Sequence, residues 1–131
     1  MRKCHVVLDT NILVSALISK FGNPSKIYKM FLSGEITLVI SDDIIIEYTD
    51  VLYRSHLKIF ADDANIVLDA IKNNGMRVEL VSSTFVMTDE SDRIFYDTAK
   101  NTGAYLITGN TRHYPIEPFI CTPAEFYEHI I

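Results

Sequence analysis

The chain has 131 residues, a length typical of one compact domain, and 48% of them are hydrophobic, which excludes a disordered protein. The formal net charge of −5 excludes binding of nucleic acid through a general basic field, so phosphates would have to be met by local cations or bound metal ions. Cys4 and Cys121 lack the spacing and companion ligands of a metal site, and no apolar run approaches membrane-spanning length. We therefore expect residues 1–131 to form a single domain of a cytoplasmic protein.

Short apolar runs alternate with helical patterns along the chain. The runs at 4–8, 37–40, 78–81, 105–108 and 119–121 predict strands. The intervening patterns predict helices from residue 11, over 25–32, 42–52 and 62–73, from 91 or 92 to about 103, and from 122. This alternation predicts an α/β fold with three layers, α/β/α, around a central parallel sheet of four to five strands.

Local signals fix several helix starts and faces. Ser41 is a good N-cap residue, and Thr122 and Glu125 have the spacing of a capping box. In the helix over 62–73 we expect Ile66, together with residues 67, 70 and 71, to face the core.

Two of the predicted strands end at polar triplets. The first runs into Asp9, Thr10 and Asn11, and the fourth runs into Thr108, Gly109 and Asn110. Parallel α/β sheets bind their ligands at the carboxyl ends of the strands. These triplets therefore predict a cleft with a carboxylate at its mouth.

Helical geometry sorts the other carboxylates. At about 100° per residue, Glu47 lies on the shoulder of the apolar face of its helix, and Asp50 points away. Asp92 lies on a shoulder in the first turn of the next acidic helix, whereas Asp97 diverges from it and is expected to be solvated or paired with a cation. Asp9, Glu47 and Asp92 can thus converge, and such hard oxygen ligands suit Mg²⁺ or Mn²⁺.

Each of these residues also has an ordinary structural explanation. Asp9 could cap a helix, Glu47 could be a surface charge, and Asp92 could be an N-cap. Asn110 could be a turn residue, and Asp89 could keep a loop solvated or support a ligand from behind. Only their combination favours a metal site.

The histidines show no ligand spacing, and no serine or cysteine has the partners of a catalytic nucleophile. Arg112 and His113 follow Asn110 closely, so they could contact a phosphate or simply lie in a surface loop.

Four motifs in order give the chain a resemblance to the PIN-domain ribonucleases. They span residues 7–17, 41–52, 89–99 and 106–115, and residues 122–126 are similar to the ending common among toxin components of toxin–antitoxin systems. The resemblance implies a Mg²⁺- or Mn²⁺-dependent endoribonuclease acting on RNA, with a small antitoxin covering the cleft and a homodimeric state.

The resemblance also implies roles for individual residues. Asp9, Glu47 and Asp92 match the metal-binding positions, and Asn110 stands at a fourth catalytic position that is often Asp. Residues expected to orient carboxylates, water or substrate are Thr10, Asn11, Asp89, Thr108 and Arg112.

Three other functions compete with a nuclease. Asn110 removes one negative charge from the site, which leaves open a catalytically weak PIN fold that binds RNA or protein. A phospho-receiver is disfavoured because no Lys ends a late strand, and a phosphatase needing Asp two residues after Asp9 is disfavoured by Asn11.

Overall fold

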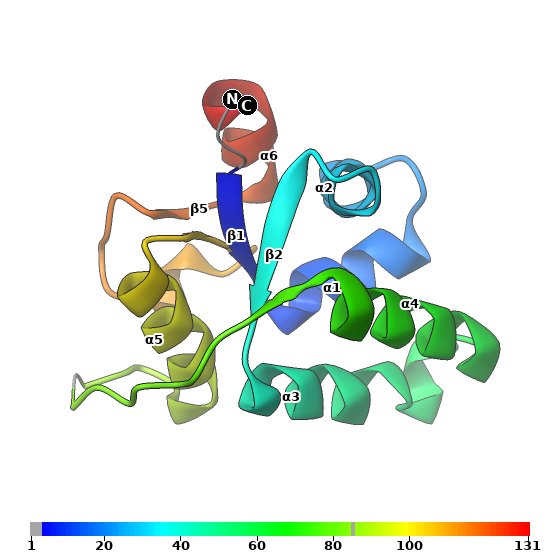
Figure 1. The fold of residues 1–131 in the computed structure, drawn as a ribbon, viewed down its shortest axis with the longest axis horizontal. Helices are drawn as coiled ribbons and strands as arrows, with labels where there is room; N and C mark the ends of the chain where they lie inside the picture. The colour runs from blue at the N-terminus through cyan, green and yellow to red at the C-terminus, as the bar shows by residue number, and fades with distance from the viewer. Residues whose placement is uncertain (1–3, 85) are drawn as a thin grey trace.

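The computed structural model describes residues 4–84 and 86–131 and shows a central sheet with helices on both faces (Figure 1). All strand pairs are parallel, and the strand order is β3-β2-β1-β4-β5. The strands are β1 (Cys4–Leu8), β2 (Ile36–Ile40), β3 (Met76–Arg77), β4 (Tyr105–Ile107) and β5 (Ile120–Cys121). This five-stranded parallel sheet confirms the predicted fold class.

The helices occupy the predicted parts of the chain. The α-helices are α1 (Thr10–Ile18), α2 (Asn23–Leu32), α3 (Asp42–Leu52), α4 (Ala61–Asn74), α5 (Arg93–Thr102) and α6 (Pro123–Glu125). Short 3₁₀ turns are η1 (Ser55–Leu57), η2 (Glu90–Asp92) and η3 (Thr111–His113), and α6 continues into the π-helical turn η4 (Phe126–Ile130). Among the described residues, none of these helices is both long and apolar enough to cross a membrane.

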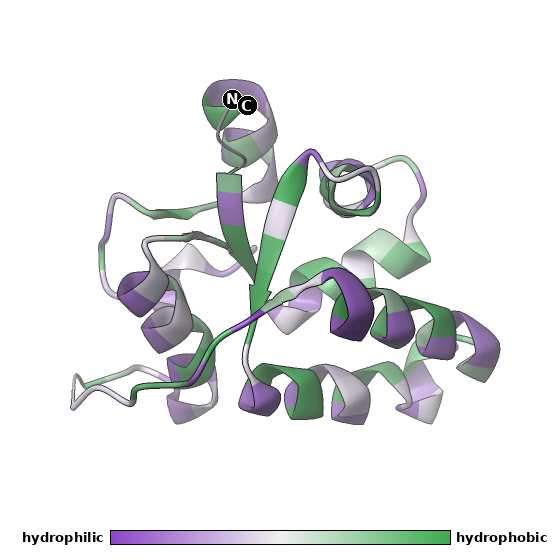
Figure 2. Cartoon of the chain, viewed as in Figure 1, coloured by the Kyte–Doolittle hydropathy of each residue, from purple (hydrophilic) through white to green (hydrophobic). Residues whose placement is uncertain are grey.

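Helix α5 packs against β1, β2 and β4, whereas α1 contacts β1 and α2 contacts β2. Figure 1 shows α5 to one side of β1 and β2, with α1, α2 and α4 on the opposite side. Figure 2 shows β2 as mostly hydrophobic and the outer helix faces as more polar, as expected for a sheet buried on both faces.

The strand order explains why the carboxyl ends of β1 and β4 form a crevice. From β1 the chain builds outward to β2 and β3 in one direction, and then returns to place β4 and β5 on the other side of β1. The topological switch therefore falls between β1 and β4, where open α/β sheets bind ligands. The register pairs Leu8 with Ile107, so Asp9 and Thr108 are the next residues on the two strands.

Local signals at the helix ends are largely confirmed. The Ser41 side chain accepts a hydrogen bond from the Ile44 amide, and Thr122 and Glu125 form the predicted capping box. Helix α4 ends at Gly75, where the backbone passes close to the preceding turn. A Cβ atom at this position would lie 2.6 Å from the Ile71 carbonyl oxygen.

Three expectations are corrected. The strand predicted at 78–81 is instead the short β3, and Val78 only donates its amide to the Ile40 carbonyl at 2.8 Å. Ile66 is 65% exposed rather than in the core, and Leu68 is buried in its place. Of the two alternatives for Asp97, the solvated one is wrong, because the residue is 1% exposed, whereas its charge does interact favourably with the nearby Arg93.

Candidate metal site at the carboxyl edge of the sheet

A hollow of about 220 Å³ lies at the carboxyl edge of the sheet, where β1, α3, η2, α5 and the loop after β4 meet. Its walls are mostly polar and rich in carboxylates. Arg54 and His113 are the basic residues among those that line it. The lining residues are Asp9, Thr10, Asn11, Glu47, Val51, Arg54, Asp89, Ser91, Asp92, Phe95, Asn110 and His113.

Asp9 is held in place by groups from the second half of the chain. It is 5% exposed, and its Oδ2 accepts hydrogen bonds from the Thr108 hydroxyl at 2.8 Å and the Tyr114 hydroxyl at 3.2 Å. In the described part of the chain, its Oδ1 has no hydrogen-bond partner. One carboxylate oxygen is therefore fixed by the protein, and the other is left for a ligand.

Thr108 connects Asp9 to the loop that carries Asn110. The Thr108 side chain is fully buried, and its hydroxyl accepts the Asn110 amide at 3.0 Å while donating to Asp9. Thr108 thus supports Asp9 from beneath the hollow rather than lining it, as predicted for a residue that orients a carboxylate.

Asp92 carries an unsatisfied oxygen into the same hollow. Its Oδ2 is buried and makes no hydrogen bond to the described residues, and His113 Nδ1 lies 3.7 Å from it. Burial, followed by the nearby charges of Asp9 and Asp89, raises the pKa of Asp92 to about 6 against the opposing effects of His113 and Tyr114. A half-buried carboxylate that has one oxygen without a hydrogen bond to the described residues, and that lies near other carboxylates, is suited to a bound cation.

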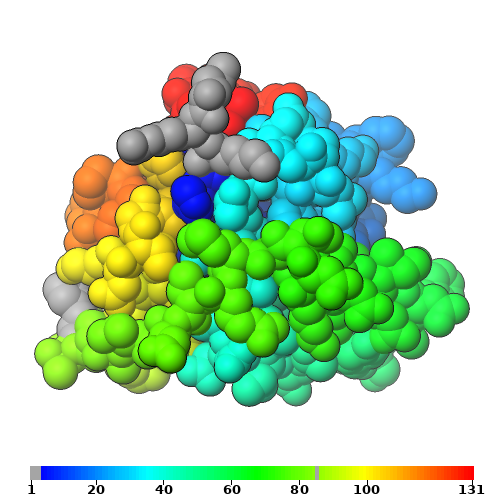
Figure 3. All heavy atoms as spheres, viewed as in Figure 1, coloured from blue at the N-terminus to red at the C-terminus, as the bar shows by residue number. Residues whose placement is uncertain are grey.

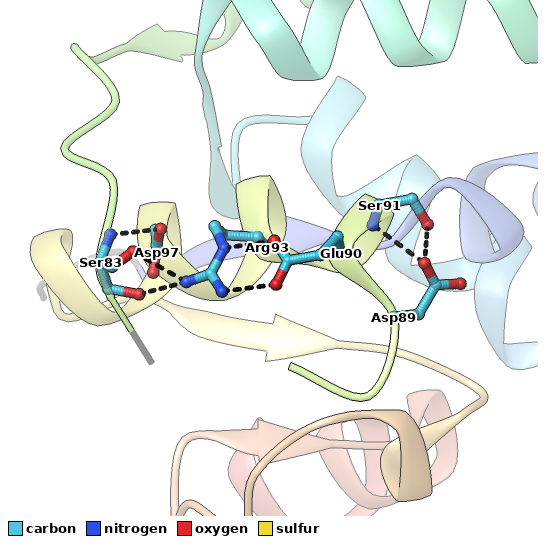
Figure 4. A network of polar contacts seen from close by, with 6 residues as sticks. All are labelled: Ser83, Asp89, Glu90, Ser91, Arg93 and Asp97. Carbon is cyan, nitrogen blue, oxygen red and sulfur yellow. Dashed lines mark hydrogen bonds and ion pairs between the residues drawn. The ribbon is translucent and has the colours of Figure 1, made fainter. Parts of the chain in front are cut away.

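A polar network holds the turn that presents Asp92 (Figure 4). Asp89 accepts the Ser91 amide at 2.9 Å and the Ser91 hydroxyl at 2.8 Å through the same oxygen, Oδ1. The Arg93 guanidinium binds both oxygens of Glu90 at 2.8 Å. Asp89 is therefore part of the turn's own bonding, which lowers its pKa.

The same network extends to the segment that follows β3. Arg93 Nη1 donates to the carbonyl and hydroxyl of Ser83, each at 2.9 Å, and the Ser83 amide donates to Asp97 Oδ2 at 2.8 Å. Figure 3 shows the chain after α4 covering this face between α4 and α5. Asp97 is buried because this segment packs over it.

Glu47, Asn110 and Arg54 complete the rim. Glu47 is half-buried on α3, as its shoulder position predicted, and Asn110 is exposed with no side-chain hydrogen bond in the described part of the chain. Arg54 pairs with Asp50 at 2.8 Å on the solvent side of α3. Arg54 follows the end of α3 in the chain and was not among the expected site residues.

The hollow brings together most of the residues singled out from the sequence. Those that line it are Asp9, Thr10, Asn11, Glu47, Asp89, Asp92 and Asn110. Thr108 lies beneath it, and Arg112 lines a separate hollow. Tyr114, which donates to Asp9, was not among the expected site residues, because an aromatic residue in a loop gives no sign of its distant partner.

The donor set fits a hard divalent cation. Two aspartates and a glutamate offer carboxylate oxygens, and Asn110 offers an amide oxygen, without cysteine ligands. The Oδ2 of Asp92, which makes no hydrogen bond to the described residues, is the observation that most directly favours a cation. Within residues 4–84 and 86–131, no three His, Cys, Asp or Glu side chains already stand close enough to form a complete ligand group.

Comparison with known proteins agrees with this architecture. Residues 5–112 match the PIN domain family, and the chain therefore belongs to that family. An uncharacterized protein of Methanocaldococcus jannaschii, MJ1680, is 29% identical over 111 residues, which cover 82% of this chain and 72% of that protein.

Two solved structures share the fold. A toxin–antitoxin complex from Klebsiella pneumoniae contains a chain that matches with a TM-score of 0.60 at 18% identity, over 90% of this chain and 97% of that one. VapBC2 from Rickettsia felis, bound to a DNA fragment from its promoter, matches with a TM-score of 0.58 at 15% identity, over 90% and 96% of the two chains.

Proposed function

We propose that this protein is a Mg²⁺- or Mn²⁺-dependent endoribonuclease and the toxin of a toxin–antitoxin pair. The observation that carries the proposal is the hollow at the switch point of the sheet, which Asp9, Glu47 and Asp92 all line and where one buried Asp92 oxygen makes no hydrogen bond to the described residues. Membership of the PIN domain family and a fold shared with chains of toxin–antitoxin complexes support it.

In this proposal Asp9, Glu47 and Asp92 hold the ion, and Asn110 adds an amide oxygen or holds a water. A bound divalent ion supplies an activated water and stabilises the charge that develops at the phosphodiester. Thr108 and Tyr114 keep Asp9 oriented through their hydrogen bonds to one of its oxygens. Arg54 and His113, on the same walls, are placed to bind the anionic backbone of the RNA.

Cleavage of single-stranded RNA by the purified protein tests this function. Cleavage should require Mg²⁺ or Mn²⁺, stop with EDTA, and be abolished in Asp9→Asn. Asp69→Asn removes an exposed carboxylate of α4 and serves as the matched control, with activity expected to be unchanged. Cleavage that survives EDTA or Asp9→Asn contradicts the mechanism.

A second candidate is a catalytically weak PIN fold that binds RNA or protein. The neutral amide of Asn110 at a position often occupied by Asp favours it, because one fewer negative charge weakens binding of cations. Absence of measurable Mn²⁺ binding, with RNA or partner binding intact, would favour this candidate. Mn²⁺ binding that is lost in Asp92→Asn would favour the nuclease.

We further propose a cognate antitoxin that covers the hollow and a homodimeric toxin in the cytoplasm. Co-expression with a small protein encoded beside this one should give a stable complex with suppressed RNA cleavage. Light scattering of the isolated chain should give twice the mass of 14.9 kDa.

A further inference from the structure

A second hollow of about 480 Å³ lies beside the candidate metal site. The loop with η3 separates the two, because Asn110 and His113 line the metal-site hollow whereas Thr111 and Arg112 line the second one. A single short turn is therefore the wall between them.

Tyr114 links the second hollow to Asp9. The residue lines the second hollow, and its hydroxyl donates to Asp9 Oδ2 at 3.2 Å in the first. A molecule in the second hollow would thus contact the residue that helps to hold Asp9.

Arg112 is the positive charge of the second hollow that is left for a ligand. It is exposed, and in the described part of the chain it makes no hydrogen bond or ion pair. Each of the two glutamates of this hollow uses one oxygen in a hydrogen bond and keeps the other: Glu125 accepts the Thr122 amide at 3.0 Å, and Glu117 accepts the Tyr96 hydroxyl at 3.3 Å. The guanidinium of Arg112 is therefore the group of this hollow at which an anion can bind.

Pro115 and Ile116 give the wall an apolar surface next to Arg112. Pro115 is half-buried, and Ile116 is fully exposed despite its size. Exposed apolar side chains beside a cation suit a ligand that combines a flat apolar face with a phosphate, as a nucleotide does.

We propose that the second hollow binds a nucleotide of the RNA next to the phosphodiester held at the carboxylates. Arg112 binds its phosphate, and the base lies against Pro115 and Ile116. The carboxylates of Glu117 and Glu125 at the same wall favour bases that carry amino donors over uracil. This subsite rests on the proposed ribonuclease function and adds a substrate preference to it.

The test compares Arg112→Gln and Ile116→Ser with two controls outside both hollows, Lys72→Gln and Ile66→Ser. Binding of a fluorescein-labelled single-stranded oligoribonucleotide is measured by anisotropy in EDTA, and KM and kcat are measured with Mn²⁺. Each hollow variant should raise Kd and KM about five- to tenfold, the cost of one lost phosphate or base contact. Direct titration should show Mn²⁺ binding retained, and both controls should match the wild type.

The outcomes separate the subsite from the function on which it rests. Variants of Arg112 and Ile116 that bind RNA as tightly as the controls overturn the subsite, even where the wild type cleaves RNA. Weakened RNA binding in EDTA, in a protein that cleaves no RNA with Mn²⁺, keeps the subsite and refutes the nuclease. Loss of binding to a protein partner, with RNA binding intact, assigns the hollow to that partner and overturns the proposal. Equal cleavage of oligonucleotides with uracil or amino-bearing bases beside the cut refutes the base preference.

Discussion

Replacing Asp92 by Asn should stabilise the metal-free protein while removing its response to metal. The substitution keeps the size of the side chain and removes the charge that burial and Asp9 disfavour. A pKa raised from 3.8 to about 6 corresponds to at most about 3 kcal/mol. Because Asp92 keeps contact with water, screening reduces the expected gain to about 1 kcal/mol, or about 3–5 °C in Tm.

The pH dependence of this gain follows from the direction of the shift. The folded-state pKa of Asp92 lies above its unfolded value, so the wild type loses stability as the pH rises from about 4 to about 6. The advantage of Asp92→Asn should therefore be present above about pH 6 and shrink at about pH 5, where the wild-type carboxyl is mostly protonated.

Urea denaturation and thermal melts in EDTA, at about pH 5 and about pH 7.5, measure this difference. Adding Mn²⁺ should stabilise the wild type at the higher pH and reverse the order of the two proteins, because the ion binds only the folded state. A variant that is no more stable than the wild type at the higher pH, or equally stabilised at both, would refute the electrostatic reasoning.

Three further substitutions test how the site is held. Thr108→Val removes the 2.8 Å hydrogen bond to Asp9, and urea denaturation should show a loss of about 1–2 kcal/mol, with weaker Mn²⁺ binding by titration; unchanged Mn²⁺ affinity would contradict its orienting role. Arg93→Gln breaks the bonds to Ser83, so hydrogen exchange of the Ser83 amide should accelerate about tenfold, and Arg93→Lys should not restore it, because lysine cannot reproduce the planar fork. Asn110→Asp adds a carboxylate to the hollow, so calorimetry should show Mn²⁺ binding about tenfold tighter and a less stable metal-free protein; weaker Mn²⁺ binding would place Asn110 outside the coordination.

The sequence was most informative where pattern and chemistry agreed. The apolar face of α3, with Ile44, Tyr48 and Leu52 buried, follows from its helical spacing. The convergence of Asp9 and Asn110 on one hollow follows from parallel strands that share a carboxyl edge. Both inferences need only local periodicity and the topology that it implies.

The predictions that were wrong concern features that depend on contacts between segments far apart in the sequence. The strand predicted at 78–81 does not form, because β2 ends at Ile40, opposite Arg77, and the chain turns there into α3 after Ser41. Asp97 is buried by the segment around Ser83, which helical geometry cannot foresee. In α4 the apolar residues are spaced closely enough to allow two neighbouring faces, and packing selected Leu68 rather than Ile66.

Because β1 is the central strand, the two sides of the site differ in how easily they open. The Asp9 amide donates to the Ile107 carbonyl at 3.0 Å, directly after a strand paired on both edges, so its proton should exchange only when the whole protein unfolds. The opposite side, with Asp92, is held by charged and polar contacts at the surface, which open locally at lower cost. The side of the site with Asp9 is therefore rigid. Conformational adjustment to an ion or a substrate occurs on the opposite side, at the start of α5.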